Sequence, residues 1–415
     1  MNQQDQVDGP NKPNRRRLSG PGQDELDAGQ AAEYLGIKRS SLYTYVSRGF
    51  LRGVRRAGHR GRLYRLEELE RFERARSEGG LDTFVASAAG GPDLLGRVGE
   101  WPQAASPVQS DAITKVLGLQ VEELAEQLWT GNRVDDLSPW NARGLGLLPV
   151  DIAGALPATA TPIDCLPLAL SALAVRDSDR FGSSTEAELY RARRLCLRLA
   201  ALLAMSSDVA RCSSALRADS LAGVFLGALS VDDRGPRRAF VDAALGLAAI
   251  QPAGPADEVV AMSSAAGSDL YSSVLAGLAL MSGPAGAGAC ARVDALLMEC
   301  QAVGGVPRAV SSRFRRGEEI PGFTERVPFP RDLAASGAGL LAALRSFPDA
   351  DESLQPVASL VDFMEHSGRG RVSLPVVLVA VERALALPRG SSEALLLLGR
   401  MIPWVGLVLR GRRRS

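Results

Sequence analysis

The sequence has few aromatic residues, very few histidines and no cysteine pattern typical of a metal site. Aromatic residues make up 5% of the 415 positions, and the only histidines are His59 and His366. The five cysteines lack CxxC and zinc-finger spacing, so we expect free thiols in a reducing compartment. Runs of β-branched residues are scarce, which argues against an all-β fold. We therefore predict neither a metal site nor a disulfide framework.

Signals for export and for membrane insertion are also lacking. The N-terminus has no series of basic, apolar and cleavage-site segments. We expect no apolar run to reach the roughly 20 residues that a membrane span needs. These absences predict a cytoplasmic protein with no membrane partner.

What the sequence does contain is the composition of a helical protein. Hydrophobic residues make up 46% of the chain. Along several stretches they recur at intervals of three and four, as on a helix that buries one face. The predicted helices span residues 111–129, 163–175, 186–205, 269–281, 288–302, 375–387 and 392–409. We therefore predict a mainly α fold.

Composition divides the chain into four parts. Residues 1–24 are polar and rich in Gly and Pro, and such a segment cannot bury enough apolar surface to fold, so we predict a disordered arm. Its basic cluster at residues 15–17 is either a contact to a phosphate backbone or a solvated tail. Residues 25–78 form a compact unit, residues 79–106 a linker rich in Gly, Ala and Pro, and residues 107–415 a large helical body.

The compact unit has the pattern of a winged helix-turn-helix. Asp27 can cap a helix over residues 28–34, and after a tight turn a second helix follows over residues 40–47. A two-stranded wing over residues 52–65 and a final helix over residues 66–76 complete the unit. The stretches AAEYLGIKRSSLYTYVSRGFL and RLYRLEELERF closely resemble the winged helices of the excisionase and mercury-resistance-regulator type.

Positive charge is concentrated in this unit. Residues 28–76 hold twelve Lys or Arg against five Glu, although the whole chain carries only +1. The second helix of such a unit enters the major groove of DNA, so the predicted base contacts are Lys38, Arg39, Ser40, Ser41, Tyr43 and Thr44. Arginines of the wing would meet phosphates, and these are Arg52, Arg55, Arg56, Arg60, Arg62 and Arg65. We predict double-stranded DNA as a partner; a protein-docking unit or a degenerate relic is the alternative.

Four stretches of the body together resemble the citrate synthase family. They read AITKVLGLQVEELAEQLWTG, ATPIDCLPLALSALAVRD, DLYSSVLAGLALMSGPAGAGACARVDALL and EEIPGFTERVPFP, and the chain end from RVSLPVVLVAVERAL onward resembles the family's last helices. The resemblance spans roughly residues 108–410. It implies an all-α body that forms a homodimer, with a large domain over about 107–257 and 373–415 and a small domain over about 258–372.

The resemblance also locates the family's catalytic positions. The family removes an α-proton from an acyl-CoA with an aspartate and uses two histidines to stabilise the enol and to polarise the oxaloacetate carbonyl. In the matching turns GPAG, IPGFTE and RVSL these positions hold Gly286, Glu325 and Ser373. A further family histidine falls near Gln251. We therefore expect the family's reaction to be absent, and we predict that no cofactor is required.

Some ligand-binding features of the family are retained. Arg400, in LLLGRMIPW, matches an arginine that contacts the dicarboxylate in the family, and Arg326 or Arg331 stands near a second one. The resemblance therefore implies an acyl-CoA or a di- or tricarboxylate as ligand. A salt bridge is the alternative role of Arg400. Asp362 and His366, four residues apart, are either an acid and base pair or part of an exposed helix face.

Three functions fit these observations. The first is a DNA-binding pseudoenzyme of this tricarboxylic acid cycle family, acting as a dimeric transcriptional regulator or a ligand sensor, with two winged helices on two half-sites. The second is a citrate or 2-methylcitrate synthase-type acyltransferase with a non-standard or repurposed active site. The third is a regulatory partner of an intact citrate synthase homologue. A palindrome upstream of the gene would favour the first, and a neighbouring gene with the full set of catalytic histidines would favour the third.

Overall fold

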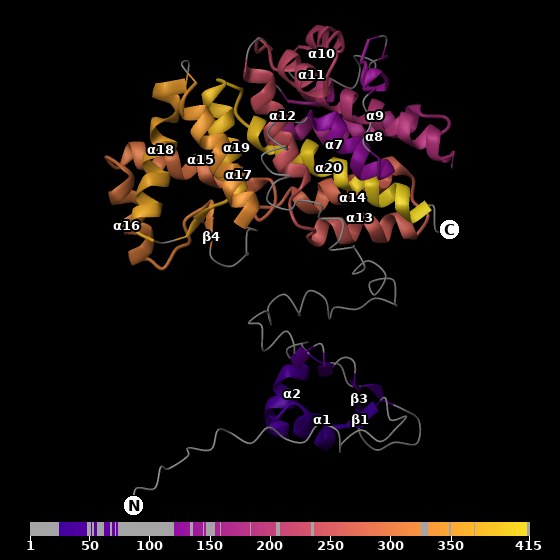
Figure 1. The fold of residues 1–415 in the computed structure, drawn as a ribbon, viewed down its shortest axis with the longest axis vertical. Helices are drawn as coiled ribbons and strands as arrows, with labels where there is room; N and C mark the ends of the chain where they lie inside the picture. Colours follow the sequence, from indigo (N-terminus) through magenta and orange to yellow (C-terminus); the bar gives the residue numbers. More distant parts are fainter. Residues whose placement is uncertain are drawn as a thin grey trace, which may run out of the picture. The chain divides into compact units, whose positions relative to one another are not determined.

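The computed structural model separates into two compact units, Met1–Gly99 and Glu100–Ser415 (Figure 1). It describes residues 25–47, 51, 54–55, 62–66, 69–70, 72–73, 120–132, 136–143, 145–146, 154–157, 159–182, 184–204, 208–233, 236–324, 331–347, 350–368 and 370–412. The predicted arm, residues 1–24, and the predicted linker, residues 79–106, lie outside the described residues.

Helices and a small antiparallel sheet build the N-terminal unit. Its elements are β1 (Glu25–Asp27), α1 (Ala28–Tyr34), α2 (Arg39–Ser47), β2 (Val54–Arg55) and β3 (Arg62–Arg65). The strand order is β1-β3-β2, so β3 pairs with both neighbours. The sequence indicated both helices and the two strands of the wing. It did not indicate β1, because a strand of three residues is too short to show an alternating pattern.

The start of α1 is fixed by a capping box. The Asp27 carboxylate accepts hydrogen bonds from the backbone amides of Gly29, at 2.7 Å, and Gln30, at 2.9 Å. The Gln30 side chain in turn accepts from the Asp27 amide. Gly36, with φ +63°, makes the turn that leads to α2. The core of the unit is formed by Leu26, Ala31, Ala32, Leu35, Leu42, Leu51, Tyr64, Leu69 and Phe72.

The body is built almost entirely of helices, which confirms the predicted fold class. Its elements are α7 (Val121–Thr130), η3 (Ser138–Trp140), α8 (Pro162–Arg176), α9 (Thr185–Ala201), η5 (Leu202–Ala204), α10 (Val209–Ala215), α11 (Leu221–Ala228), α12 (Pro236–Ala249), α13 (Pro255–Ala265), α14 (Leu270–Met281), α15 (Gly288–Ala302), α16 (Val306–Arg315), β4 (Phe323–Thr324), α17 (Arg331–Arg345), α18 (Asp351–His366), β5 (Arg371–Val372), α19 (Leu374–Ala384) and α20 (Ser391–Arg412).

The predicted and observed helices of the body differ mainly at their ends. The helix over 288–302 has the bounds of α15. The predicted helix 111–129 corresponds to α7, and its part before residue 120 lies outside the described residues. The predicted helix 186–205 is α9, which tightens into a 3₁₀ turn, η5, in its last residues. A sequence period cannot separate the two helix types at a helix end.

Helix α20 is the centre of the body. It packs against helices from most of the body, namely α7, α8, α9, α12, α13, α14, α15 and α19. It is also the one helix among the described residues that is long and apolar enough to cross a membrane, contrary to the expectation that no run has that length. Its most apolar window is 94% buried inside the protein, so α20 is a core helix (Figure 1).

Small residues allow the helices to approach α20 closely. A Cβ atom on Gly399 would lie 2.5 Å from the Ala248 Cβ and 2.7 Å from the Leu245 carbonyl oxygen of α12. A Cβ on Gly277 of α14 would lie 3.0 Å from the Trp404 ring. Only glycine fits at both crossings, because any side chain would force the helices apart.

The predicted boundary between a large and a small domain of the body stays a prediction, because residues 100–415 form one compact unit. Residue 258, the predicted start of the small domain, falls inside α13, and α13 and α14 pack against α20. Helices α15, α16 and α18 pack on one another, α15 and α18 also pack on α19, and Figure 1 shows these helices on one side of the body.

Two buried carboxyl groups lie where α7, α11 and α12 meet. Glu122 is 1% exposed and accepts a hydrogen bond from the Leu221 amide at the start of α11. Asp242 is 9% exposed and accepts a long hydrogen bond, 3.5 Å, from the Val121 amide. Burial, and the nearby negative charge of Glu122, raise the pKa of Asp242 from 3.8 to about 8. Asp242 is therefore protonated in the folded protein at neutral pH.

This pKa predicts how stability depends on pH. Between pH 4 and 8 Asp242 is ionised in the unfolded chain and protonated in the folded one, so stability falls as pH rises through this window. Asp242→Asn keeps the oxygen acceptor and removes the titration. We expect the variant to lose less stability between pH 5 and 8, by up to about 1.4 kcal/mol per pH unit, in urea unfolding curves. Equal pH slopes for the two proteins would contradict the assignment.

Candidate functional site

The predicted base contacts lie at the start of α2. Lys38, Arg39 and Ser40 are exposed, Ser41 is half-buried, and Tyr43 is 53% exposed. The Arg39 guanidinium lies against the first turn of α1, in the space left by the missing Cβ of Gly29. The backbone of Thr44 belongs to α2, but its side chain lies outside the described residues. The start of α2 therefore presents positive charge and one large aromatic ring to solvent.

The wing is described only in part. Arg62 and Arg65, at the ends of β3, are exposed, whereas Tyr64 between them is buried in the core. The backbone of Arg55 pairs with Arg62 in the β2–β3 register. The remaining predicted phosphate contacts, Arg52, Arg56 and Arg60, lie outside the described residues, as does His59.

Gly286, the first of the three positions that the sequence predicts to match the family's catalytic residues, sits in a turn without room for a side chain. The turn folds back on the end of α14, and the Ala287 amide donates to the Met281 carbonyl at 2.7 Å. A Cβ atom on Gly286 would lie 2.3 Å from that same carbonyl oxygen. Since the obstacle is backbone, a histidine at this position would require the turn itself to shift.

The second and third positions flank a two-stranded pair. β4 pairs with β5, with Phe323 opposite Val372, and this pairing brings the IPGFT segment next to Ser373. Ser373 stands at the N-cap position of α19, and its amide and hydroxyl both donate to the Gly322 carbonyl, at 3.0 and 2.8 Å. Its hydroxyl thus connects the start of α19 to the residue before β4. Glu325 lies outside the described residues.

Arg400, the retained ligand candidate, is buried in an ion pair of the same chain. It is 5% exposed, and its Nη2 contacts the Asp257 carboxylate of α13. Its Nη1 donates to the Gln251 carbonyl at 3.0 Å. In this arrangement the guanidinium is already neutralised, so an acid ligand would have to replace Asp257. Arg331 begins α17, with its side chain outside the described residues, and Arg326 lies wholly outside them.

Asp362 and His366 do not form an acid and base pair in this structure. The Asp362 carboxylate pairs with Arg345 at 2.9 Å, on an exposed face. The His366 Nδ1 lies 2.6 Å from the Asp362 backbone oxygen. The two side chains therefore have separate partners, and the exposed-face interpretation holds.

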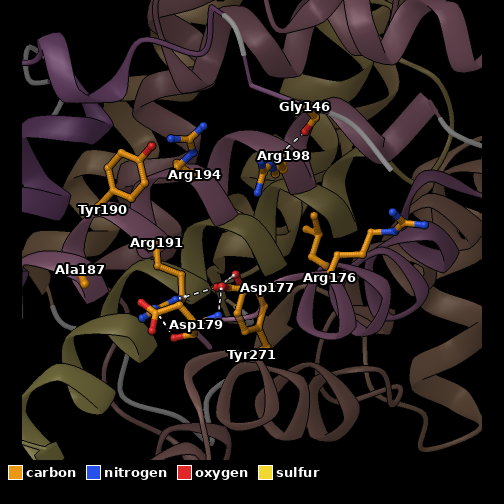
Figure 2. Close-up of a pocket in the computed structure, with 11 residues that line it drawn as sticks. Gly146, Arg176, Asp177, Asp179, Ala187, Tyr190, Arg191, Arg194, Arg198 and Tyr271 are labelled. Atoms are coloured by element: carbon orange, nitrogen blue, oxygen red, sulfur yellow. Dashed lines mark hydrogen bonds and ion pairs between the residues drawn. The ribbon is translucent and has the colours of Figure 1, made fainter. Parts of the chain in front are cut away.

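A pocket that the sequence did not indicate lies elsewhere in the body. It has a volume of about 390 Å³ and is formed by α8, α9 and the start of α14 (Figure 2). Its charged lining residues are Arg176, Asp177, Asp179, Arg191, Arg194 and Arg198. Three of these arginines recur at helical spacing in RARRLCLR, a signal that could have been noticed. A basic helix face is usually solvated, so the pattern alone does not predict a pocket.

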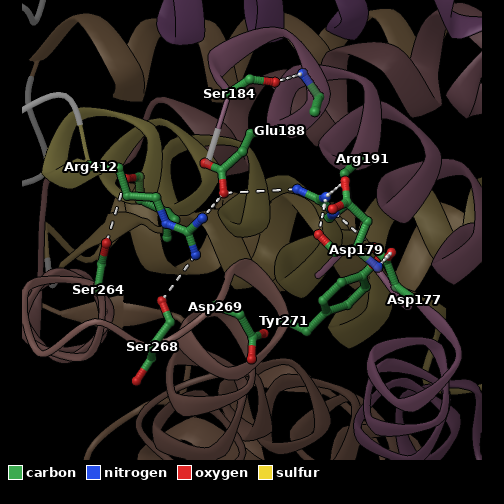
Figure 3. A network of polar contacts seen from close by, with 12 residues as sticks. Asp177, Asp179, Ser184, Glu188, Arg191, Ser264, Ser268, Asp269, Tyr271 and Arg412 are labelled. Carbon is green, nitrogen blue, oxygen red and sulfur yellow. Dashed lines mark hydrogen bonds and ion pairs between the residues drawn. The ribbon is translucent and has the colours of Figure 1, made fainter. Parts of the chain in front are cut away.

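Contacts with the end of α20 support one wall of this pocket (Figure 3). Glu188 of α9, 2% exposed, contacts Arg412 at the end of α20 and lies 3.9 Å from Arg191. Arg412 also donates to the Ser268 carbonyl before α14. Burial raises the pKa of Glu188, although Arg412 and Arg191 oppose this effect. These contacts connect α9, the end of α20 and the residues before α14 beside the pocket.

The fold defines a class of protein in which a helix-turn-helix unit is followed along the chain by an all-α body of the citrate synthase type. Residues 119–410 match the family model for the citrate synthase C-terminal domain, and residues 25–77 match that for a helix-turn-helix domain. The chain belongs to the citrate synthase family, and the resemblance seen in the sequence is confirmed. No curated protein matches the chain.

Solved structures agree on the fold of the body. Citrate synthase from Thermotoga maritima MSB8 is 18% identical, with a TM-score of 0.57, and the match covers 72% of this chain and 83% of that one. A ternary complex of citrate synthase from Thermoplasma acidophilum with carboxymethyl coenzyme A and oxaloacetate has the same identity and coverage and a TM-score of 0.60. At this identity the likeness shows a shared fold.

The turn at Gly286 yields a paired test. Gly286→Ala should destabilise the protein by about 1–3 kcal/mol, because the added Cβ meets the Met281 carbonyl oxygen. Gly283→Ala, in the same turn, is the control, because nothing lies within 4 Å of its added Cβ. Urea unfolding curves of both variants measure the difference. If the two variants were equally stable, the turn would have room for a side chain at Gly286.

Proposed function

We propose that the chain is a DNA-binding regulator whose citrate synthase body does not carry out acyl transfer. The observation that carries the proposal is the exposed basic start of α2 on a folded winged unit, where Lys38 and Arg39 lie at the surface. A recognition helix reads bases from this end, and arginines such as Arg62 and Arg65 on an adjacent wing suit phosphates. The helix-turn-helix match supports the same function.

The state of the family's catalytic positions supports the second half of the proposal. Gly286 has no space for a side chain, and the Ser373 hydroxyl is bonded to the Gly322 carbonyl. General acid and base groups each contribute about 10² to 10⁴ to a rate, so their replacement should remove most of the family's activity. Arg400 is paired with Asp257 inside the core. An acyl-CoA or a di- or tricarboxylate remains the ligand that we propose for the family's own site.

A homodimer would place two winged units on two half-sites. The body exposes large apolar side chains mainly on α8, α9, α13 and α14, which pack beside one another. Val175 is 80% exposed, Leu280 48% and Met262 38%. Large exposed apolar residues on adjoining helices are typical of an interface. We propose that a second copy of the chain covers them.

DNA binding is tested by selection from a pool of random duplexes, followed by fluorescence anisotropy on the enriched sequence. We expect an inverted repeat to be enriched, because a two-fold dimer binds two equivalent half-sites. Lys38→Ala/Arg39→Ala should weaken binding to that duplex by about 1–3 kcal/mol for each side chain that no longer reaches a base. Glu33→Gln, exposed on α1, is the matched control and should bind like wild type. No enriched sequence, or equal binding by the double variant, would refute the proposal.

Acyl transfer is tested by thiol release from acetyl-CoA and from propionyl-CoA with oxaloacetate. We expect no release above background, because the positions of the family's catalytic groups hold Gly286, Glu325 and Ser373. Turnover at about 1 s⁻¹ or more, an ordinary rate for an enzyme, would instead show an acyltransferase with a non-standard active site. The two tests are independent, so an active enzyme could still prove to bind DNA.

A further inference from the structure

Helix α9 carries a ridge of polar and aromatic side chains on the face that the proposed dimer covers. The ridge is formed by side chains that recur at intervals of four residues, namely Glu186, Tyr190, Arg194 and Arg198. Glu186 is exposed, Tyr190 is 55% exposed, and the two arginines are half-buried. At a rise of 1.5 Å per residue the ridge extends about 18 Å along the helix. It is therefore long enough to contact a second helix over several turns.

Within one chain the charges of this ridge stay unbalanced. No ion pair is formed by Glu186, Arg194 or Arg198 in the part of the chain that the structure describes. The Arg198 Nε donates to the Gly146 carbonyl at 3.0 Å, and the Arg194 guanidinium lies 4.4 Å from the centre of the Tyr190 ring (Figure 2). The two arginines are one turn apart, where like charges repel each other. Partial burial lowers the pKa of Arg194, and the charge of Arg198 lowers it further.

The order of the side chains along the ridge is self-complementary. When two copies of a helix run antiparallel about a two-fold axis, residue i of one copy meets residue j of the other, and j meets i. Glu186 and Arg198 lie at equal distances on either side of residue 192, and so do Tyr190 and Arg194. An axis that passes residue 192 therefore satisfies both pairs at once. It places the carboxylate opposite a guanidinium and the aromatic ring opposite another.

The helix geometry and the surrounding surface suit such a contact. Ridges of residues spaced four apart interdigitate in the commonest class of helix crossing. The Tyr190 ring holds Arg194 of its own chain, and its exposed part is available to a second guanidinium. Val175 and Leu280, on the neighbouring helices α8 and α14, supply apolar surface, which does not fix a register. Complementary charges do fix one, because a shifted register would bring like charges together.

We propose that α9 pairs antiparallel with α9 of a second copy, with Glu186 bound to the partner's Arg198 and Tyr190 against the partner's Arg194. By symmetry each contact occurs twice. The pairing rests on the homodimer of the proposed function and adds the side chains that select a second copy of this chain over another apolar surface. The pocket beside α9 is then covered by the partner, whose Glu186 supplies the negative charge that Arg198 lacks in its own chain.

The experiment is sedimentation velocity of the full-length chain over a range of concentrations. Glu186→Arg and Arg198→Glu should each weaken dimerisation by about tenfold or more, because like charges then face each other at two contacts. A mixture of these two variants should dimerise about as tightly as wild type, because opposite charges face each other at both contacts of the mixed dimer. Glu365→Arg, an exposed position on α18 with the same change of charge, is the matched control and should dimerise like wild type.

Recovery in the mixture excludes a folding defect, since two misfolded chains would not restore each other. Dimerisation of either single variant at wild-type strength would overturn the pairing and leave the homodimer in place, and so would a mixture that stays weak. Recovery of Glu186→Arg by Arg194→Glu instead of Arg198→Glu would overturn the register about residue 192. A wild-type chain that stays monomeric at every concentration would overturn the homodimer together with the pairing, whereas DNA binding is tested separately by the duplex selection.

Discussion

The burial of α20 on all its faces is the constraint on which the rest of the body depends. A helix without a solvent face needs close neighbours in every direction, and Gly399 against Ala248 supplies that closeness on the α12 side. It also needs an internal partner for each polar group. Arg400 finds Asp257 and the Gln251 carbonyl, and the Trp129 indole donates to the Ile402 carbonyl at 2.8 Å. Helices α7 and α13 are thereby held against α20.

Close packing and internal pairing also affect the positions that the resemblance links to catalysis. At the positions that the resemblance links to the family's chemistry, Gly286 lies against backbone, the Ser373 hydroxyl donates to the Gly322 carbonyl, and Arg400 is paired inside the core. Polar groups with no partner are found instead in the pocket beside α9, where the protein gathers positive charge that its own carboxylates do not balance.

Much of the local structure could be predicted because it depends on local signals. Asp27 caps α1 through its own neighbouring amides, and the apolar spacing in residues 288–302 predicts a helix with the bounds of α15. The strand β1 escaped prediction because its pairing with β3 is made across the unit. The extent of a smaller domain within the body stays a prediction, because the amphipathic pattern of a helix does not identify the neighbours it packs on.

The sequence by itself determined the helical class, the winged unit and the family, since each of these is carried by residue identity and short-range spacing. Only the tertiary structure decided that Gly286 has no room for a side chain and that Arg400 is paired with Asp257. It also decided that Arg194 and Arg198 face a pocket. The reason is physical: free space and charge balance depend on atoms brought together from distant parts of the chain.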